Sequence, residues 1–269
     1  MTNTIGFIGA GNMGGAIIGG LLDSGARKPE AIVVSDPRAE IREDLEQRYP
    51  GIRTTAENAG AADAAVLILA VKPQVCETVL NGIRDDLSDS TVLASIAAGV
   101  TLDSLSRWCR PGARIVRVMP NAPALVREGM SALSPGVGVT EEELNTVKDI
   151  FDSVGRSIVL PESLMDAFTA LAGSSPAWVF MFLEALADGA VREGMPRDAA
   201  YAVAAQAVLG AAALARDAGT HPGVLKDRVC SPGGTTIEAV ATLEDRGFRS
   251  ALIAAVRDCT RRAEELGGR

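Results

Sequence analysis

The chain has 269 residues, 47% hydrophobic and 22% charged, which is typical of a globular protein with one large domain or two modest ones. Its formal net charge of −8 argues against nucleic acid as a partner, because nucleic-acid binding needs clustered positive charge. The start MTNTIGFIGAG lacks the basic segment of a signal peptide, and the apolar run at 200–215 is short and alanine-rich for a membrane span. We therefore expect a cytoplasmic protein that has no membrane partner.

The first 160 residues alternate short β-branched runs with helical patterns, which predicts a mostly parallel sheet with helices on both faces. Strands are expected at 4–8, 31–35, 65–70, 91–96 and 114–119, with further strands near 130–134 and at 157–161. Helices are expected at 12–24, 38–48, 74–85, 101–108 and 141–153. We expect this α/β domain, a doubly wound Rossmann sheet, to span residues 1–161.

After Pro161 the strand signals stop, and residues 162–269 are predicted to form an all-helical domain. Helical patterns are separated by glycine, proline or capping signals such as GSSP and CSPGG, and they lie at about 163–172, 176–193, 197–217, 222–229, 235–245 and 248–266. The helix at 197–217 is apolar almost all round, so it needs cover on every side. We expect a second subunit to cover it; the alternative is the central helix of a monomeric bundle.

The stretch Gly9-Ala10-Gly11-Asn12-Met13-Gly14 is a GxGxxG motif between a strand and a helix, which is the context of a dinucleotide-binding loop. In such loops Gly9 allows the tight turn, Gly11 lets the backbone approach the pyrophosphate, and Gly14 lets the helix pack closely. We expect Asn12 and Met13 to contact the cofactor as well.

The second strand ends in Ser35-Asp36-Pro37-Arg38, and this ending points to two cofactors at once. Asp36 lies near the distance at which an acid commonly binds the adenosine ribose of NAD, whereas Ser35 and Arg38 suit the 2′-phosphate of NADP. Asp36 is also a common turn residue before a proline. We expect both cofactors to work and NADPH to be preferred.

Further cofactor contacts are expected beyond the carboxyl ends of the other strands, where doubly wound sheets bind ligands. The residues concerned are Ala70, Val71, Lys72 and Pro73 after one strand, Ala97, Ala98 and Gly99 after the next, and Asn58. Small residues at 97–99 leave room for a nicotinamide ring; the alternative is close packing of strand and helix. Four scattered cysteines and one histidine offer no metal-binding pattern, so no metal is expected.

The segment CSPGGTTIEA at 230–239 places a glycine-containing turn before a helical pattern. Such a helix start leaves backbone N–H groups free, and free N–H groups at that end attract anions. The alternative is an ordinary N-cap in which Ser231 or Thr235 caps the helix.

The chain resembles the pyrroline-5-carboxylate reductase family over nearly its whole length. The resemblance rests on FIGAGNMG (7–14), AVKPQ (70–74), SIAAGVT (95–101), RVMPNAPALVREG (117–129), GSSPAW (173–178), EALADGAVREGMPRDAA (184–200) and LKDRVCSPGGTTIEAVATLE (225–244). It implies reduction of 1-pyrroline-5-carboxylate to L-proline with NAD(P)H, the last step of proline biosynthesis. It also implies a homodimer or a decamer of dimers, with active sites where the helical domains interlock.

For a substrate of this kind, the expected anion at the second helix start is the substrate carboxylate. The substrate-binding residues are then Ser231, Gly234, Thr235 and Thr236, and the Thr236 hydroxyl serves the ring nitrogen as the catalytic group.

Two other functions fit parts of the pattern. Other reductases on this plan bring a catalytic lysine on a helix that connects the domains, and residues 163–195 contain no lysine. A dinucleotide-sensing protein without activity is possible on a Rossmann fold, but it has no need of the CSPGGTT segment.

Overall fold

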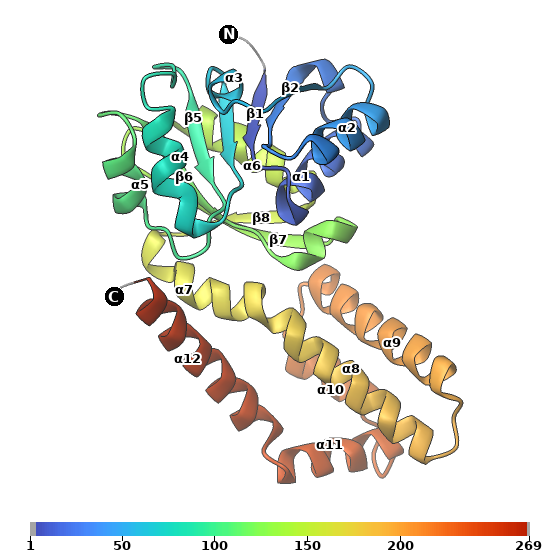
Figure 1. Ribbon diagram of the computed structural model, residues 1–269. Coiled ribbons are helices and arrows are strands. Elements are labelled where there is room, and N and C mark those ends of the chain that lie inside the picture. Colours follow the sequence, from blue (N-terminus) through green and yellow to red (C-terminus); the bar gives the residue numbers. More distant parts are fainter. Residues whose placement is uncertain (1–3, 268–269) are drawn as a thin grey trace. The chain divides into compact units, whose positions relative to one another are not determined.

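The computed structural model describes residues 4–267, which form two compact units (Figure 1). The first contains the residues up to Gly173 together with the end of the last helix from Thr260, and the second runs from Ser174 to Cys259. The first is built on a sheet and the second of helices, which confirms the predicted fold class.

The sheet of the first unit has eight strands in the order β3-β2-β1-β4-β5-β6-β7-β8. Along the chain they are β1 (Ile5–Ile8), β2 (Ile32–Ser35), β3 (Arg53–Thr55), β4 (Val66–Leu69), β5 (Val92–Ser95), β6 (Arg114–Met119), β7 (Gly129–Pro135) and β8 (Gly155–Val159). The first six are parallel, in the doubly wound order whose ligand crevice lies beyond the carboxyl ends of the strands. β7 is antiparallel to β6, and β8 is parallel to β7.

Helices cover both faces of the sheet, which explains why its central strands are apolar without alternation. One face carries α1 (Asn12–Asp23), α2 (Ala39–Arg48) and α6 (Glu141–Asp152). The other carries α3 (Ala59–Ala62), α4 (Cys76–Gly82) and α5 (Leu102–Trp108). Four 3-10 turns join these elements: η1 (Pro29–Ala31), η2 (Pro73–Val75), η3 (Ala122–Val126) and η4 (Glu162–Leu164).

Most predicted elements of this unit lie where expected, with small differences at their ends, but β3 and α3 escape the sequence patterns. Residues 53–62 read RTTAENAGAA, which has neither the β-branched run of a buried strand nor the apolar period of a long helix. β3 forms because it pairs with β2 at the edge of the sheet. Pairing with β2 therefore stabilises a strand that the local sequence pattern does not predict.

The predicted break at GSSP is wrong. The chain is helical from Glu162 to Arg192 without interruption. Within this run, α7 (Met165–Phe168) passes into a π-helix (η5, Thr169–Ser174) and then into α8 (Ser175–Arg192). The π turn contains Gly173 and Ser174, and Pro176 falls in the first turn of α8, where a proline is tolerated. The helical run therefore continues through GSSP, and π segments are frequent at functional sites.

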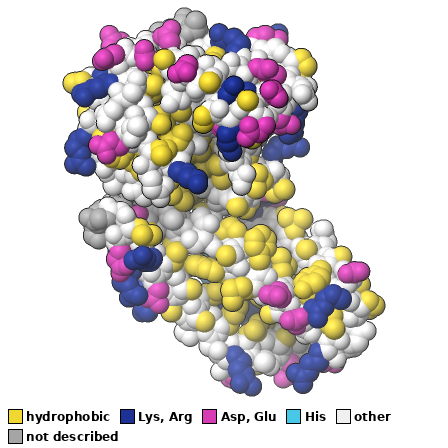
Figure 2. All heavy atoms as spheres, viewed as in Figure 1, with side chains coloured by type: hydrophobic (Ala, Val, Ile, Leu, Met, Phe, Trp, Pro, Cys, Tyr) yellow, Lys and Arg dark blue, Asp and Glu magenta, His cyan; other side chains and the backbone are white. Residues whose placement is uncertain are grey.

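The second unit consists of α8, α9 (Arg197–Ala218), α10 (Pro222–Val229), α11 (Thr235–Asp245) and most of α12 (Phe248–Leu266). Its large apolar side chains are widely exposed, for example Phe180 at 66%, Met181 at 68% and Ile253 at 70%. Figure 2 shows such side chains spread across the visible face of this unit. A surface of this kind is typical of a protein interface.

The helix α9 shows the same exposure, and only Ala200 and Ala204 of it are fully buried within the described chain. By length and composition, Glu162–Arg192 and Arg197–Ala218 are apolar enough to cross a membrane, and 11% of each apolar window is buried. The described residues thus do not cover this helix. The alternative of a central helix in a monomeric bundle is wrong.

Candidate active site

The nucleotide loop between β1 and α1 places each glycine of the motif in a different steric situation. Gly9 has φ +93°, and a Cβ there would lie 2.6 Å from the Ala70 carbonyl oxygen. A Cβ on Gly14 would lie 2.5 Å from the Gly9 oxygen, whereas no atom lies within 4 Å of a Cβ built on Gly11. Packing therefore requires Gly9 and Gly14. At Gly11 the space in front of the loop is open, as the approach of a pyrophosphate requires.

The start of α1 suits an anion. Its N-cap is Gly11, with no side-chain cap hydrogen bond and no acidic residue in the first turn. The first N–H groups are therefore free to bind phosphate. Asn12 is exposed and Met13 is half-buried, packed against the core of the α1 face.

Asp36 at the end of β2 is only 2% exposed, and its carboxylate is surrounded by N–H donors. Burial by itself would raise the pKa of this carboxyl. Hydrogen bonds from the Arg38 side chain, the Ala10 backbone and the Arg38 backbone outweigh that effect and lower the pKa to about 2.

We expect this carboxylate to make folding pH-dependent. Because the folded pKa of Asp36, about 2, lies below its ordinary value of 3.8, its stabilisation is complete above pH 4 and is lost as the pH falls toward 2. The contribution is about 2 kcal/mol at neutral pH. Urea unfolding from pH 7 to pH 3 measures it: the stability of Asp36→Asn should fall less steeply than that of the wild type below pH 4. Parallel curves would contradict the assignment.

The neighbouring predicted residues are connected side chain to side chain. Ser35 is fully buried, and its hydroxyl donates to Asn58 Oδ1 over 2.8 Å. Asn58 is half-buried and directly precedes α3. Ser35 thus holds Asn58 in place, and a direct contact between Ser35 and a cofactor stays a prediction.

The strand ends of β4 and β5 lie beside each other in the sheet, and they carry the remaining predicted cofactor residues. After β4, Val71 and Pro73 are half-buried and Lys72 is exposed. After β5, Ala97 is buried in the core, whereas Ala98 and Gly99 are exposed. Close packing of strand and helix therefore explains why residue 97 is small. Ala98 and Gly99 leave open space beyond the end of β5.

Two side chains that sequence reasoning missed connect this edge to the long helical run. Asn121, at the end of β6, is 8% exposed; its Nδ2 donates to the Ala172 carbonyl (2.9 Å) and its Oδ1 accepts from the Met130 N–H (2.8 Å). The buried Arg117 of β6 pairs with Glu162 at 2.9 Å. The motif RVMPNAPALVREG contains both Arg117 and Asn121, but their partners lie too far along the chain for a sequence pattern to reveal.

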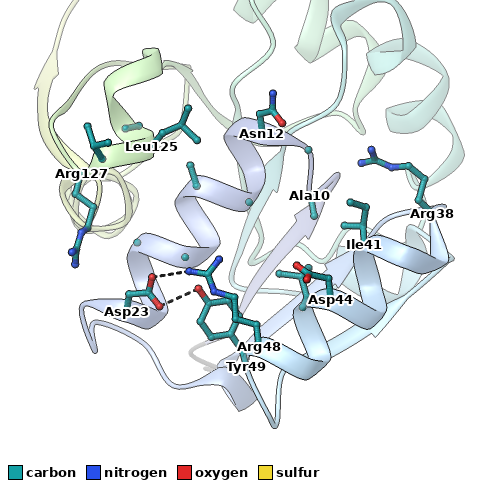
Figure 3. Close-up of a pocket in the computed structure, with 18 residues that line it drawn as sticks. Ala10, Asn12, Asp23, Arg38, Ile41, Asp44, Arg48, Tyr49, Leu125 and Arg127 are labelled. Atoms are coloured by element: carbon teal, nitrogen blue, oxygen red, sulfur yellow. Dashed lines mark hydrogen bonds and ion pairs between the residues drawn. The ribbon is translucent and has the colours of Figure 1, made fainter. Parts of the chain in front are cut away.

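A groove of about 500 Å³ flanks the nucleotide loop between α1, α2 and η3 (Figure 3). Gly11, Asn12 and Arg38 line it, so the structure brings these three predicted residues to one cavity. At another part of the groove Asp23 accepts hydrogen bonds from Arg48 and Tyr49. The other predicted cofactor residues do not line this groove.

In the second unit, the turn at 230–234 joins α10 to α11 and exposes the start of α11. Gly233 has φ +65°, and the N-cap of α11 is Gly234, with no side-chain cap hydrogen bond. The alternative of an ordinary cap by Ser231 or Thr235 is therefore wrong. The Ser231, Thr235 and Thr236 hydroxyls have no partner in the described residues, whereas Thr242, later in the same helix, bonds to the Glu238 carbonyl. Thr235 is exposed and Thr236 half-buried.

Comparisons with known proteins agree with this arrangement. Residues 162–266 match the family described as pyrroline-5-carboxylate reductase dimerisation, and residues 4–99 match that described as NADP oxidoreductase coenzyme F420-dependent. The chain is 46% identical to the pyrroline-5-carboxylate reductase of Methanosarcina acetivorans, over 98% of this chain and 97% of that protein. It is also 46% identical to that of Escherichia coli, over 99% of each.

The chain belongs to the pyrroline-5-carboxylate reductase family. The predicted resemblance is thereby confirmed. A solved structure of such a reductase from Coxiella burnetii matches with a TM-score of 0.94 at 35% identity, covering 99% of both chains. Another from Plasmodium falciparum, with NADP bound, matches with a TM-score of 0.86 at 30% identity, again covering 99% of both. The dimerisation match also explains why this reductase exposes its apolar helices: they associate with a second copy.

Within residues 4–267 no group of three or more histidine, cysteine or acidic side chains is placed to hold a metal ion. Burial raises the pKa of the Cys76 and Cys109 thiols to about 11, so both are protonated at neutral pH.

Proposed function

We propose that this chain reduces the cyclic imine of 1-pyrroline-5-carboxylate to L-proline, the last step of proline biosynthesis, with NAD(P)H as the hydride donor. Family membership, with relatives 46% identical over nearly the full length, carries this conclusion. When bound, the cofactor supplies the hydride for the imine carbon. The chain's own residues bind the cofactor and the substrate, orient them toward each other, and exclude water.

The start of α11 is proposed to bind the substrate carboxylate. The N–H groups of Thr235 and Thr236 are free of any side-chain cap, and the helix dipole adds to their attraction for an anion. The N–H of Gly234 instead donates to the Ser231 carbonyl oxygen (3.0 Å), so Gly234 contributes by its lack of a side chain. The Ser231 hydroxyl lies beside Gly234, close enough that a Cβ on that glycine would meet it at 2.3 Å. Ser231 is thus placed to add a third donor.

Thr236 is proposed as the group that hydrogen-bonds the ring nitrogen of the substrate. It is half-buried, lies one residue inside α11, and keeps its hydroxyl free of partners in the described residues. A hydroxyl is too weak an acid to protonate an imine alone, so Thr236 orients the nitrogen and relays a proton from water.

The nucleotide loop and the strand ends of the first unit are proposed to bind the cofactor. The start of α1, in front of Gly11, would hold the pyrophosphate, and Asn12 and Met13 lie in the first turn of that helix. The exposed Ala98 and Gly99 leave room for the nicotinamide. NADPH is the preferred form, and the charges at the end of β2 support this choice.

One assay tests the reaction. The purified protein is mixed with NADPH or NADH, and loss of absorbance from the reduced cofactor is followed with and without added 1-pyrroline-5-carboxylate. Oxidation that depends on the imine, together with formation of proline, is the expected result. Binding of NADPH without such turnover would indicate a dinucleotide sensor instead.

We further propose that the active protein is a homodimer or a decamer of dimers, with residues 162–269 as its substrate and dimerisation domain. The dimerisation match over 162–266 and the exposed apolar side chains of α8, α9 and α12 support self-association. The net charge of −8 supports a protein that does not bind nucleic acid, and the proposal includes a cytoplasmic location and no membrane partner.

Sedimentation should show a dimer or a multiple of it at micromolar protein concentration. Burial of the exposed apolar side chains of α9, such as Val203, Leu209 and Leu214, supplies the free energy of association. Replacing Leu209 by glutamate should shift the protein to smaller species, whereas replacing the exposed Glu43 of the first unit by lysine should not. A stable wild-type monomer would contradict this proposal.

A further inference from the structure

The carboxylate of Asp36 has no hydrogen-bonding capacity left over. Its Oδ1 accepts from the Arg38 backbone N–H (3.1 Å) and from Arg38 Nε (2.9 Å). Its Oδ2 accepts from the Ala10 N–H (2.9 Å) and from Arg38 Nη2 (2.8 Å). An ionised carboxylate offers about four lone-pair sites, and all of them are used here.

A ribose diol needs the opposite arrangement. To bind the 2′- and 3′-hydroxyls of NADH, an acid at the end of β2 must offer free lone pairs to the O–H donors. Asp36 is 2% exposed and fully engaged with the nucleotide loop and with Arg38. It is therefore built into the loop rather than available to a ligand.

The side chain of Arg38, unlike that of Asp36, keeps hydrogen-bonding groups that no atom of the described residues uses. Two of its five N–H donors are held by Asp36 in a bidentate pair, and the side chain remains 49% exposed. Its other three N–H donors have no protein partner within residues 4–267. Figure 3 shows Arg38 at the rim of the groove that Ala10 and Asn12 also line.

A second cation lies at the same place. The half-buried Arg42, one turn further along α2, donates from Nη1 to the Asp36 carbonyl oxygen over 2.7 Å. Arg38 and Arg42 bring two guanidinium groups to this end of β2, where the nearby carboxylates are the hydrogen-bonded Asp36 and Glu40 in the first turn of α2. The Arg38 guanidinium thus presents positive charge with free N–H donors at the groove. A phosphate dianion matches both features.

We propose that Asp36 is a positioning residue that fixes the guanidinium of Arg38 for the 2′-phosphate of NADPH, and is not a ligand of the cofactor ribose. The proposal rests on the proposed function of the nucleotide loop. It accounts for both indications in the Ser-Asp-Pro-Arg sequence. Asp36, an acid at the position typical of NAD sites, holds Arg38, and Arg38 binds the 2′-phosphate of NADPH.

The test compares cofactor affinities in Asp36→Asn, Arg38→Ala and the double variant, measured by the fluorescence of NADPH and NADH. Competition by 2′,5′-ADP and 5′-AMP repeats the comparison without the nicotinamide. Arg38→Ala should raise the Kd for NADPH roughly tenfold to a hundredfold, since hydrogen bonds to a charged group are lost. Asp36→Asn should raise it roughly fivefold to tenfold, with the Kd for NADH changed about twofold at most.

The double variant shows whether Asp36 acts through Arg38. If it does, Asp36→Asn adds nothing to the NADPH loss of Arg38→Ala. Glu43→Gln, which removes one negative charge from the exposed side of α2, is the matched control and should change neither Kd. If Asp36→Asn does not fold, Arg38→Ala carries the test alone: it should weaken NADPH and 2′,5′-ADP, and leave NADH and 5′-AMP as tight or tighter, because Asp36 is released.

The opposite results are equally distinct. A larger loss of NADH than of NADPH in Asp36→Asn would show that Asp36 binds the ribose and would overturn the proposal. Equal losses of both cofactors in each variant would show a purely structural pair, with the same consequence. Failure of the proposed reaction shows up separately, as wild-type protein that binds these nucleotides but does not oxidise NADPH when 1-pyrroline-5-carboxylate is added.

Discussion

Replacing Thr236 by valine should lower kcat/KM for 1-pyrroline-5-carboxylate roughly tenfold to a hundredfold, a loss of about 1–3 kcal/mol of transition-state stabilisation. Valine keeps the shape of threonine and removes only the hydroxyl, which has no partner in the described residues. The fold therefore loses no internal hydrogen bond, and the loss falls on the substrate. Steady-state kinetics with varied imine concentration, alongside circular dichroism, measures both.

Three controls surround this prediction. Thr235→Val should cost less, because Thr235 is given mainly a backbone role in binding the carboxylate. NADPH affinity should hardly change in either variant, since the nucleotide loop is in the other unit. Proline-like cyclic acids should inhibit competitively, whereas analogues without the acid group should bind far worse. Full activity of Thr236→Val, with no inhibition by cyclic acids, would show that the substrate binds elsewhere.

Replacing Gly11 by valine should abolish cofactor binding in a protein that still folds. Gly11 has φ −68°, which any residue adopts, and no atom lies within 4 Å of a Cβ at this position. The added Cβ therefore meets no atom of the described residues. The valine side chain occupies the space through which the pyrophosphate reaches the start of α1. Loss of NADPH fluorescence enhancement, with an unchanged unfolding midpoint, is the expected result.

The matched variant is Gly14→Val, which lies only three residues further along the chain but in a crowded position. A Cβ at Gly14 would lie 2.5 Å from the Gly9 carbonyl oxygen, which is backbone and unable to move aside. This variant should lose stability, and the loss of binding follows from unfolding. Near-normal NADPH affinity in Gly11→Val would show that the pyrophosphate does not pass this loop.

Much of the first unit could be predicted from the sequence because its signals are local. A buried parallel strand needs a short apolar run, and the turn after β1 needs glycine locally because Gly9 has φ +93° and a Cβ on Gly14 would lie 2.5 Å from the Gly9 oxygen. The same holds for CSPGGTT, where the glycines before α11 leave its N–H groups without a side-chain cap. These features depend on neighbours within a few residues, so a pattern in one chain is enough to reveal them.

The tertiary structure decided the rest. The sequence offers Asp36 to a ribose as readily as to a turn, and only the approach of Ala10, 26 residues away, and of Arg38 uses up its lone pairs. The GSSP segment has the composition of a break, yet it joins a π-helix to α8 without interruption, and Asn121, 51 residues earlier, donates to the Ala172 carbonyl of that π-helix. The apolar α9 pattern showed that the helix needs cover, but its exposure showed that the described chain does not supply that cover. In each case the free energy comes from partners distant in the sequence or on another copy, and local pattern carries no record of them.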